Sequence, residues 1–256
     1  MAAAMRRFLI DPSCVLNGEI TIRDKREIHH MRNALRLRPG AEAMLSDGSG
    51  NEFFSQLIGY TDDGGTLSAH FEVLYARAAD TEPETKVTLF QCLPKRGKME
   101  SIIQKTTELG VYAVVPVISA RSVSRPADMT AKTARWQRIA EEACKQSGRG
   151  AVPAVCESIG VSDIPAAVPT DTLLIFPYEQ EQAVSIKSVL RAHGASGEAR
   201  EIALIIGPEG GFTGQEADML RSAGACVCSL GKTILRTETA GPAAIAMIRY
   251  ELELDE

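Results

Sequence analysis

Several features that mark other protein classes are missing from this 256-residue sequence. No apolar run approaches about 20 residues, so we expect no membrane-spanning helix. Residues 1–10 hold arginines but no apolar core of a secretory signal, which predicts a cytoplasmic protein. The six cysteines form no C-x-x-C pair and only four histidines occur, so we expect reduced, buried thiols and no metal site.

The common nucleotide-binding fingerprints are also missing, since neither G-x-G-x-x-G nor the full phosphate-loop pattern occurs. What is present near the C-terminus is a branched apolar run, 202–206, that stops at Gly207-Pro208. This pattern predicts a buried strand that enters a tight turn. Thr213 and Glu216 have the spacing of a capping box, so a helix should follow the turn.

A second loop, 227–242, again follows a short apolar strand and leads into a helical pattern over 243–252. In a parallel sheet, the loops that follow the strands share the carboxyl edge, so both loops are expected to line one pocket. Apolar side chains there would hold a flat base, and backbone amides and carbonyls would read its polar edge. The alternative is that both are ordinary strand-to-helix turns.

Together, residues 207–212 and 230–240 resemble the bacterial family of 16S (small-subunit) ribosomal RNA uridine-N3 methyltransferases, which belong to the knotted SPOUT class. Residues 91–99, 108–122 and 146–153 are similar to the same family, so the resemblance covers nearly the whole chain. One position departs from it. The family usually has Arg where this chain has Thr233, so an RNA or phosphate contact is not carried over to that side chain. Lys232 would substitute only as a point charge.

The periodicity predicts an α/β protein. From residue 86 onward, strands alternate with helices, which favours a parallel sheet covered on both faces. Short strands with clear turn signals in residues 1–75 favour a small β-barrel, which the resemblance identifies as a PUA-like RNA-binding domain. Residues 76–85 are polar and acidic and are expected to be a linker to a methyltransferase domain, 86–256. The resemblance also implies a C-terminal trefoil knot and a homodimer.

The resemblance implies S-adenosyl-L-methionine as the methyl donor and N3 of a specific uridine as the acceptor. N3–H is a weak acid between two carbonyls, so a base and donors to the carbonyl oxygens should help. We expect Arg236 to face those oxygens or the adjacent phosphate. Glu238 would take the proton or orient Arg236. The alternative is an Arg–Glu pair that only shapes the loop.

Cofactor contacts are expected at the ends of the strands, largely through backbone atoms. They comprise Phe176, Pro177, Gly207, Glu209, Gly210, Gly211, Leu230, Gly231, Ile234, Leu235, Thr239 and Ala240.

The net charge of −5 hides alternating basic and acidic blocks. Residues 1–40 carry eight Lys/Arg against four Asp/Glu, and residues 86–150 carry twelve against five, so these two blocks are candidates for a polyanion-facing surface. N3 lies on the Watson–Crick edge, so the target base must be unpaired or flipped out. The RNA partner is expected to be the small-subunit ribosomal RNA, within the assembled subunit. Candidate phosphate contacts are Arg6, Arg7, Lys95, Arg96, Lys98, Arg121, Arg125 and Arg149.

Three other interpretations compete. A SPOUT ribose 2′-O-methyltransferase typically has an early asparagine in its catalytic domain, and this chain has none after Asn51. A non-enzymatic ribosome-assembly factor would bind RNA without the cofactor. A small-molecule α/β enzyme would leave the basic loops without a role.

Overall fold

The structure, a computed structural model, describes residues 5–95, 97–123, 128–194 and 201–253. Its internal contacts divide the chain into two units. The first comprises Met1–Glu82 and Cys144–Val152, and the second comprises Pro83–Ala143 and Pro153–Glu256. Nothing in the sequence pattern predicted that 144–152 would join the first unit. Strand β6 (Thr66–Ala78) also runs three residues into the segment expected to be a linker.

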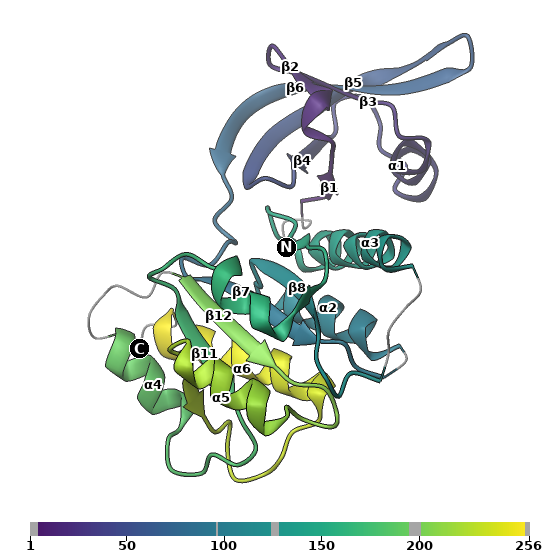
Figure 1. Ribbon diagram of the computed structural model, residues 1–256. Coiled ribbons are helices and arrows are strands. Elements are labelled where there is room, and N and C mark those ends of the chain that lie inside the picture. Colours follow the sequence, from purple (N-terminus) through teal and green to yellow (C-terminus); the bar gives the residue numbers. More distant parts are fainter. Residues whose placement is uncertain (1–4, 96, 124–127, 195–200, 254–256) are drawn as a thin grey trace. The chain divides into compact units, whose positions relative to one another are not determined.

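The first unit contains a six-stranded sheet in the order β1-β4-β5-β6-β3-β2, in which only β1 and β4 pair in parallel. The long hairpin of β5 and β6 curves across the unit (Figure 1). One face of the sheet buries an apolar core that includes Ile20, Leu45 and Phe71. The strands are β1 (Arg7–Leu9), β2 (Val15–Leu16), β3 (Glu19–Ile22), β4 (Glu42–Ser46), β5 (Asn51–Asp63) and β6.

The spacing of Ile28, Met31 and Leu35 predicts a helix over 23–37, but the observed helix is shorter and less regular. It consists of α1 (Lys25–His29), capped by the Asp24 carboxylate, and a π-helical turn η2 (His30–Ala34). Arg36 has a φ of +52°, which ends the helical path before residue 37. A 3₁₀ turn, η1 (Pro12–Cys14), precedes β2.

The second unit is built on a parallel sheet in the order β10-β8-β7-β12-β11-β13, with β9 beside β8. Alternate residues of β7 face opposite cores. Val87 and Leu89 join one apolar cluster, whereas Phe90 and Cys92 join the other. The predicted parallel α/β sheet with both faces covered is confirmed. The strands are β7 (Lys86–Cys92), β8 (Ala113–Ile118), β9 (Ala154–Val155), β10 (Ile159–Gly160), β11 (Leu173–Pro177), β12 (Glu201–Ile206) and β13 (Cys226–Cys228).

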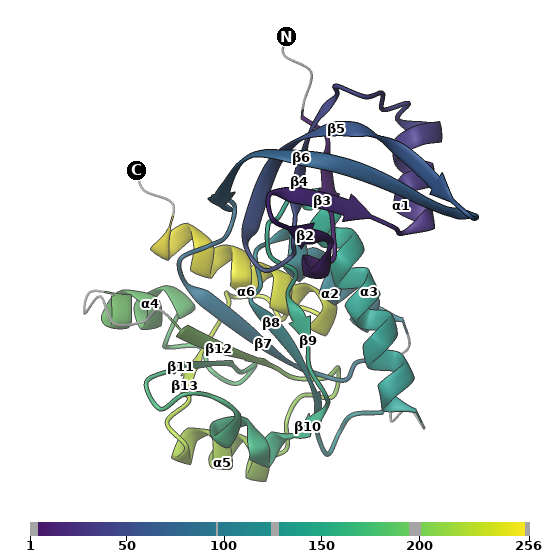
Figure 2. The ribbon, with the colours of Figure 1, turned by 90° about the horizontal axis from the view of Figure 1, so that it is seen from above.

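Helices cover the two faces unequally. Figure 2 shows α5 on one side of the sheet and α4 and α6 on the other. The predicted capping box of α5 is confirmed, because Thr213 Oγ1 accepts from Glu216 N while Glu216 Oε2 accepts from Thr213 N. The helical segments are α2 (Lys98–Glu108), α3 (Met129–Ser147), the 3₁₀ turn η3 (Val161–Ala167), α4 (Ile186–Gly194), α5 (Gly214–Ser222) and α6 (Thr237–Leu252).

Two predicted helix starts were wrong. The sequence pattern predicts a helix over 181–192, whereas α4 begins five residues later, at Ile186. Helix α6 begins at Thr237, six residues before the expected Ala243, so part of the expected loop is its first turn. The apolar face of α6, including Ala244, Ile245 and Ile248, is buried within the unit. That face therefore gives no separate support for a dimer.

All six cysteines are free thiols, as expected, but only Cys92, Cys144 and Cys228 are buried, and the other three are half-buried. Burial raises the pKa of Cys228 to about 12, and it raises that of the fully buried Cys92 as well. The described residues include no group of three or more His, Cys, Asp or Glu side chains placed to bind a metal. No described helix has the length and apolar character needed to cross a bilayer.

Candidate functional site

Four strands deliver their loops to one edge of the parallel sheet. β7, β12, β11 and β13 are successive neighbours and run in the same direction, so the segments that follow them meet at their carboxyl ends. The two loops singled out in the sequence follow β12 and β13, and the loop after β11 lies between them. The structure thus brings the two expected loops to the same edge.

A buried set of hydrogen bonds joins the turn after β12 to the start of α6. Thr237 Oγ1 donates to the Gly207 carbonyl at 2.7 Å and accepts from Gln91 Nε2 at 3.0 Å. Gln91 is fully buried and Thr237 is 5% exposed. We call this set (Gln91, Thr237, Gly207) the Thr237 link. One atom of this set is left unsatisfied: Gln91 Oε1 is buried and accepts no hydrogen bond from the described residues.

A set of charges joins the same two segments at a second place. Lys98 Nζ, on the first residue of α2, lies 2.9 Å from Glu209 Oε1 and 3.0 Å from Glu238 Oε2. Glu209 also accepts from the backbone N–H of Lys95 at 3.1 Å and 3.2 Å. We call this set (Lys98, Glu209, Glu238) the Lys98 link. Its three side chains are 22–31% exposed, so it is partly shielded from water.

The Lys98 link shifts the pKa of each member. The contacts with the carboxylates of Glu209 and then Glu238 raise the pKa of Lys98. Burial alone would raise the pKa of Glu209, but Lys98 and nearby backbone N–H groups together hold that pKa below its usual value. The pKa of Glu238 is lowered, first by its own backbone N–H at the start of α6 and then by Lys98. All three groups are therefore charged at neutral pH.

Tight packing shapes the turn after β12. A Cβ at Gly207 would lie 2.9 Å from Cε2 of Phe212, whose ring packs edge-on against Phe176 with centroids 5.1 Å apart. Gly211 has a φ of +66°, and a Cβ there would lie 2.6 Å from Glu179 Oε1. Glycine is required at both positions. Phe176 is fully buried, backbone included, so the expected cofactor contact at this residue does not fit its burial.

Arg121 holds the same turn from the loop after β8. Its Nη1 donates to the carbonyl of Gly210 at 2.8 Å and to that of Phe212 at 3.2 Å. A Cβ at Gly210 would lie 3.4 Å from Cβ of Arg121. Arg121 was expected to contact phosphate, but in the structure it positions the loop.

The loop after β13 presents open backbone and apolar side chains. Ser229 anchors it through Ser229 N–H to Val184 O at 2.8 Å and Ile186 N–H to Ser229 O at 3.0 Å. Gly231 has a φ of +143°, and Ile234 is 83% exposed. Among the described residues, none accepts a hydrogen bond from the backbone N–H of Leu230, Ile234 or Leu235. Free amides beside exposed apolar groups fit the polar edge and the face of an adenine base.

The first turn of α6 fits the expected cofactor role less well. The backbone N–H groups of Thr239 and Ala240 both donate to the Arg236 carbonyl, at 2.8 Å and 2.9 Å. Ala240 is also buried in the apolar core. Neither N–H is free for a ligand, so only the exposed Thr239 side chain can offer a contact there. The sequence pattern missed this because it placed the helix start six residues later.

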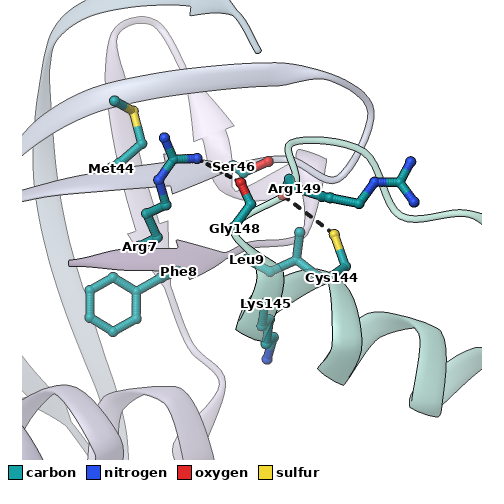
Figure 3. A pocket seen from close by; sticks show the side chains of 9 residues that line it. All are labelled: Arg7, Phe8, Leu9, Met44, Ser46, Cys144, Lys145, Gly148 and Arg149. Atoms are coloured by element: carbon teal, nitrogen blue, oxygen red, sulfur yellow. Dashed lines mark hydrogen bonds between the residues drawn. The ribbon is translucent and has the colours of Figure 1, made fainter. Parts of the chain in front are cut away.

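Two hollows lie away from the loops of the candidate site. One small cavity of about 20 Å³ lies in the first unit, where Arg7 Nη1 donates to the Gly148 carbonyl at 2.8 Å (Figure 3). An open hollow of about 330 Å³ lies between η3 and α5 and includes Val161, Gln215 and Met219. Neither contains a residue of 207–212 or 229–240, so the candidate site is formed by loops at the sheet edge and not by these hollows.

Comparison with known families decides what these loops belong to. The model of an RNA methyltransferase domain matches residues 81–249, and that of an RNA methyltransferase PUA domain matches residues 22–67. The chain belongs to the RNA methyltransferase family. The family resemblance and the PUA-like domain predicted from the sequence are confirmed.

Relatives of this methyltransferase are known by sequence and by structure. Ribosomal RNA small subunit methyltransferase E of Bacillus subtilis is 33% identical over 231 residues, 89% of each chain. The protein of the same name from Synechocystis is 31% identical and covers 96% of this chain and 78% of its own. The crystal structure of a Neisseria gonorrhoeae ribosomal RNA small subunit methyltransferase E bound to S-adenosyl methionine has a TM-score of 0.80. It shares 34% identity and covers 96% of this chain and 97% of its own.

The basic residues expected to contact RNA have very different surroundings in this methyltransferase. Arg7 pairs with the buried Glu52 at 2.6 Å, and Arg149, only 6% exposed, pairs with Glu82 at 2.6 Å. Both are structural ion pairs, which disfavours a phosphate contact. Lys98 is engaged by two carboxylates. Arg6 and Lys95 are exposed, whereas Arg96 and Arg125 lie outside the described residues.

Two residues of the site were not found in the sequence. Gln91 is a polar residue within the apolar run 89–93, and that interruption was a usable signal. Glu179 follows β11 in the loop between the two expected loops, but only the sheet order shows that it lies against Gly211.

Proposed function

We propose that this chain transfers a methyl group from S-adenosyl-L-methionine to N3 of a specific uridine in 16S, small-subunit ribosomal RNA. The observation that carries the proposal is that the loops after β12 and β13 are tied together at one sheet edge by the Thr237 link and the Lys98 link. The names of the relatives and the cofactor in the Neisseria structure support the same reaction.

The cofactor, when bound, supplies an electrophilic methyl group on a sulfonium, so no metal is needed. We assign its nucleoside to the open backbone of the loop after β13, where Leu230, Gly231, Ile234 and Leu235 combine free amides with apolar cover. On the other side, the assigned residues are Gly207, Glu209, Gly210, Gly211 and Pro177. Much of the acceleration then comes from alignment of the methyl group with N3.

Arg236 is the residue we assign to the uracil. It is the N-cap residue of α6 and is exposed, and none of the described carboxylates forms an ion pair with it. Loss of the N3 proton spreads negative charge onto O2 and O4, and a guanidinium directed at those oxygens stabilises that charge.

Glu238 is poorly suited to accept the N3 proton. Its lowered pKa, from its own backbone N–H and from Lys98, makes it a weak base. We therefore assign Glu238 to positioning within the Lys98 link and leave the proton to water at the open edge of the site. If Glu238 were the base instead, Glu238→Gln would abolish methylation without weakening cofactor binding.

We propose that the first unit and the loops of the second unit bind the RNA. Arg6 and Lys95 are exposed and suit phosphate contacts. A ribosomal RNA substrate of this kind places the enzyme in the cytoplasm. Comparison of methylation rates on naked 16S RNA and on assembled small subunits tests whether the assembled subunit is the substrate.

We also propose that the C-terminal segment forms a trefoil knot and that two copies associate. The sheet order supports a knot, because α6 follows the edge strand β13 yet packs over β7 and β12, so residues 229–236 must cross back past the ends of other strands. Exposed Ile234 and Tyr250, at 83% and 70%, are apolar surface that a second copy would cover. Sedimentation of the wild-type protein and of Tyr250→Glu tests the dimer.

The deciding experiment is mass spectrometry of 16S ribosomal RNA from cells that lack this protein, with rescue by the wild type and by Arg236→Ala. We expect loss of one N3-methyluridine and rescue by the wild type alone. Loss of a ribose methylation instead would indicate the 2′-O-methyltransferase. Unchanged RNA, together with no binding of S-adenosyl-L-methionine in calorimetry, would favour the non-enzymatic assembly factor.

A further inference from the structure

We propose that Lys98 is a positioning residue of the methyl-transfer site, which sets the spacing between the turn after β12 and the first turn of α6. The inference rests on the proposed function, because those two segments are the ones we assign to the cofactor. It gives Lys98 a role other than the phosphate contact expected from its place in a basic loop.

The backbone of Lys98 is held in a fixed position. Lys98 is the first residue of α2, and the next residues on that helix, including Met99, Ile102 and Ile103, are buried in the core of the second unit. The preceding Gly97 has a φ of +77°, which suits glycine and starts the helix abruptly. An ammonium on this base meets Glu209 and Glu238 at a place fixed by the core.

Lys98 separates two carboxylates that repel each other. Since both lie about 3 Å from one Nζ, their nearest oxygens are within about 6 Å of each other. Like charges at this separation and partial burial disfavour each other's ionised form. Yet the pKa of each Glu is lowered, because Lys98 and backbone N–H groups outweigh that repulsion. Without Lys98, the two segments would be pushed apart.

The Thr237 link cannot replace this contact. It fixes the carbonyl of Gly207, at the beginning of the turn, whereas Glu209 and Gly210 lie further along and are exposed. Arg121 holds the Gly210 carbonyl but comes from the loop after β8 and does not reach α6. Among the described contacts, the Lys98 link is the one that joins the middle of the turn to the first turn of α6.

The test uses Lys98→Met, which keeps the length and apolar stem but removes the charge, with Lys105→Met on an exposed position of the same helix as the matched control. At pH 7.5 we expect Lys98→Met to weaken S-adenosyl-L-methionine binding about tenfold in calorimetry. We expect Lys98→Arg to recover most of the loss and Lys105→Met to bind as the wild type does.

The pH dependence separates positioning from a general loss of structure. A carboxylate with a lowered pKa loses its contribution only as the pH falls through that lowered value, below the ordinary 4.5, and a raised lysine pKa keeps Lys98 charged to above 10.5. Wild-type affinity should therefore be flat from pH 5.5 to 8. In Lys98→Met, affinity should rise as the pH is lowered toward 5.5, because protonation of one carboxylate relieves the repulsion.

A second readout needs no cofactor. Hydrogen exchange of residues 207–213 in the cofactor-free protein should be faster in Lys98→Met than in Lys105→Met. Unchanged cofactor affinity and unchanged hydrogen exchange in Lys98→Met would overturn the proposal for Lys98. Methylation by the wild-type protein would still support the proposed function in that case. A wild type that binds no cofactor would instead remove the proposed function. Should Lys98→Met not fold, Lys98→Gln undergoes the same measurements, and wild-type behaviour there overturns the proposal.

Discussion

Two sets of basic side chains, one in each unit of this chain, have opposite surroundings. In the first unit, Arg7 and Arg77 both pair with Glu52, whose side chain is fully buried, at 2.6 Å and 2.9 Å. In the second unit, Arg236 and Lys232 are exposed, and none of the described ion pairs includes them. Basic residues are therefore structural at the first set of positions and available to a ligand at the second.

The reason lies with the acidic partner. Burial of a carboxylate is unfavourable unless a cation and hydrogen bonds compensate its charge. The arginines beside Glu52 and Glu82 therefore form ion pairs with these residues and are not available to a ligand. Arg236 occupies the N-cap position of a helix, where no buried carboxylate needs it. Counting basic residues along the sequence thus overestimates the RNA-facing charge of the first unit and misses the selective exposure in the second.

The largest effect is expected at the exposed arginine. We expect Arg236→Ala to lower kcat/KM by about 10²- to 10³-fold, because a donor to the developing negative charge is lost. The free energy of unfolding should change by less than about 0.5 kcal/mol, as is usual for surface positions. Methylation assays with saturating cofactor, paired with urea denaturation, measure both. A large loss of stability in Arg236→Ala would erase the contrast between the two units.

For Arg149, which is held in an ion pair, we expect a loss of stability. Arg149→Met leaves Glu82 with the N–H groups of Gly150 and Ala151 but without its cation. Breaking a fully buried ion pair costs about 3 to 5 kcal/mol, and because Glu82 is 21% exposed we expect about 2 kcal/mol. Urea denaturation measures the loss, and Arg6→Met is the exposed control.

RNA binding by the same variant decides whether Arg149 contacts phosphate. For folded Arg149→Met, the dependence of RNA affinity on salt should match the wild type. A slope reduced by about one charge, with no loss of stability, would show that Arg149 does contact phosphate and that the assignment to structure is mistaken.

The fold was largely readable from local pattern, whereas charge pairing was not. The buried strand at 202–206 and the capping box of α5 depend on residues close in sequence, and both were predicted. The start of α6 was not, because Gly241-Pro242 indicated a break. Pro242 cannot donate to the Glu238 carbonyl, but burial of Thr237 and Ala240 holds the helix together through it.

The candidate site divides in the same way. Its loops were found because glycine-rich turns after apolar strands are local signals. The ion pairs of Lys98 and Arg149 were not predicted because their partners, Glu238 and Glu82, are far away in sequence. Contacts of this kind become visible only when the strand order places distant loops together.

A smaller effect is expected when the hydrogen bonds of the Thr237 link are removed. Thr237→Val keeps the shape of the side chain but loses the donor to Gly207 O and the acceptor for Gln91 Nε2. Groups left unsatisfied in a buried place cost about 1 to 3 kcal/mol, and we expect about 1 kcal/mol in urea denaturation with a severalfold weaker affinity for the cofactor. Thr237→Ser keeps the hydroxyl and should behave as the wild type. Equal losses in both variants would assign the effect to packing.

The smallest effect is expected where the chain departs from its family. Thr233 is exposed, next to the exposed Lys232, so an added guanidinium would reach solvent without displacing a partner. We expect Thr233→Arg to leave stability unchanged and to steepen the salt dependence of RNA binding by about one charge, because one more phosphate is neutralised. Lys232→Ala should make it shallower by a similar amount. If both variants leave the slope unchanged, the loop after β13 does not contact the RNA backbone. The exposure of its cations would then have no connection with RNA binding.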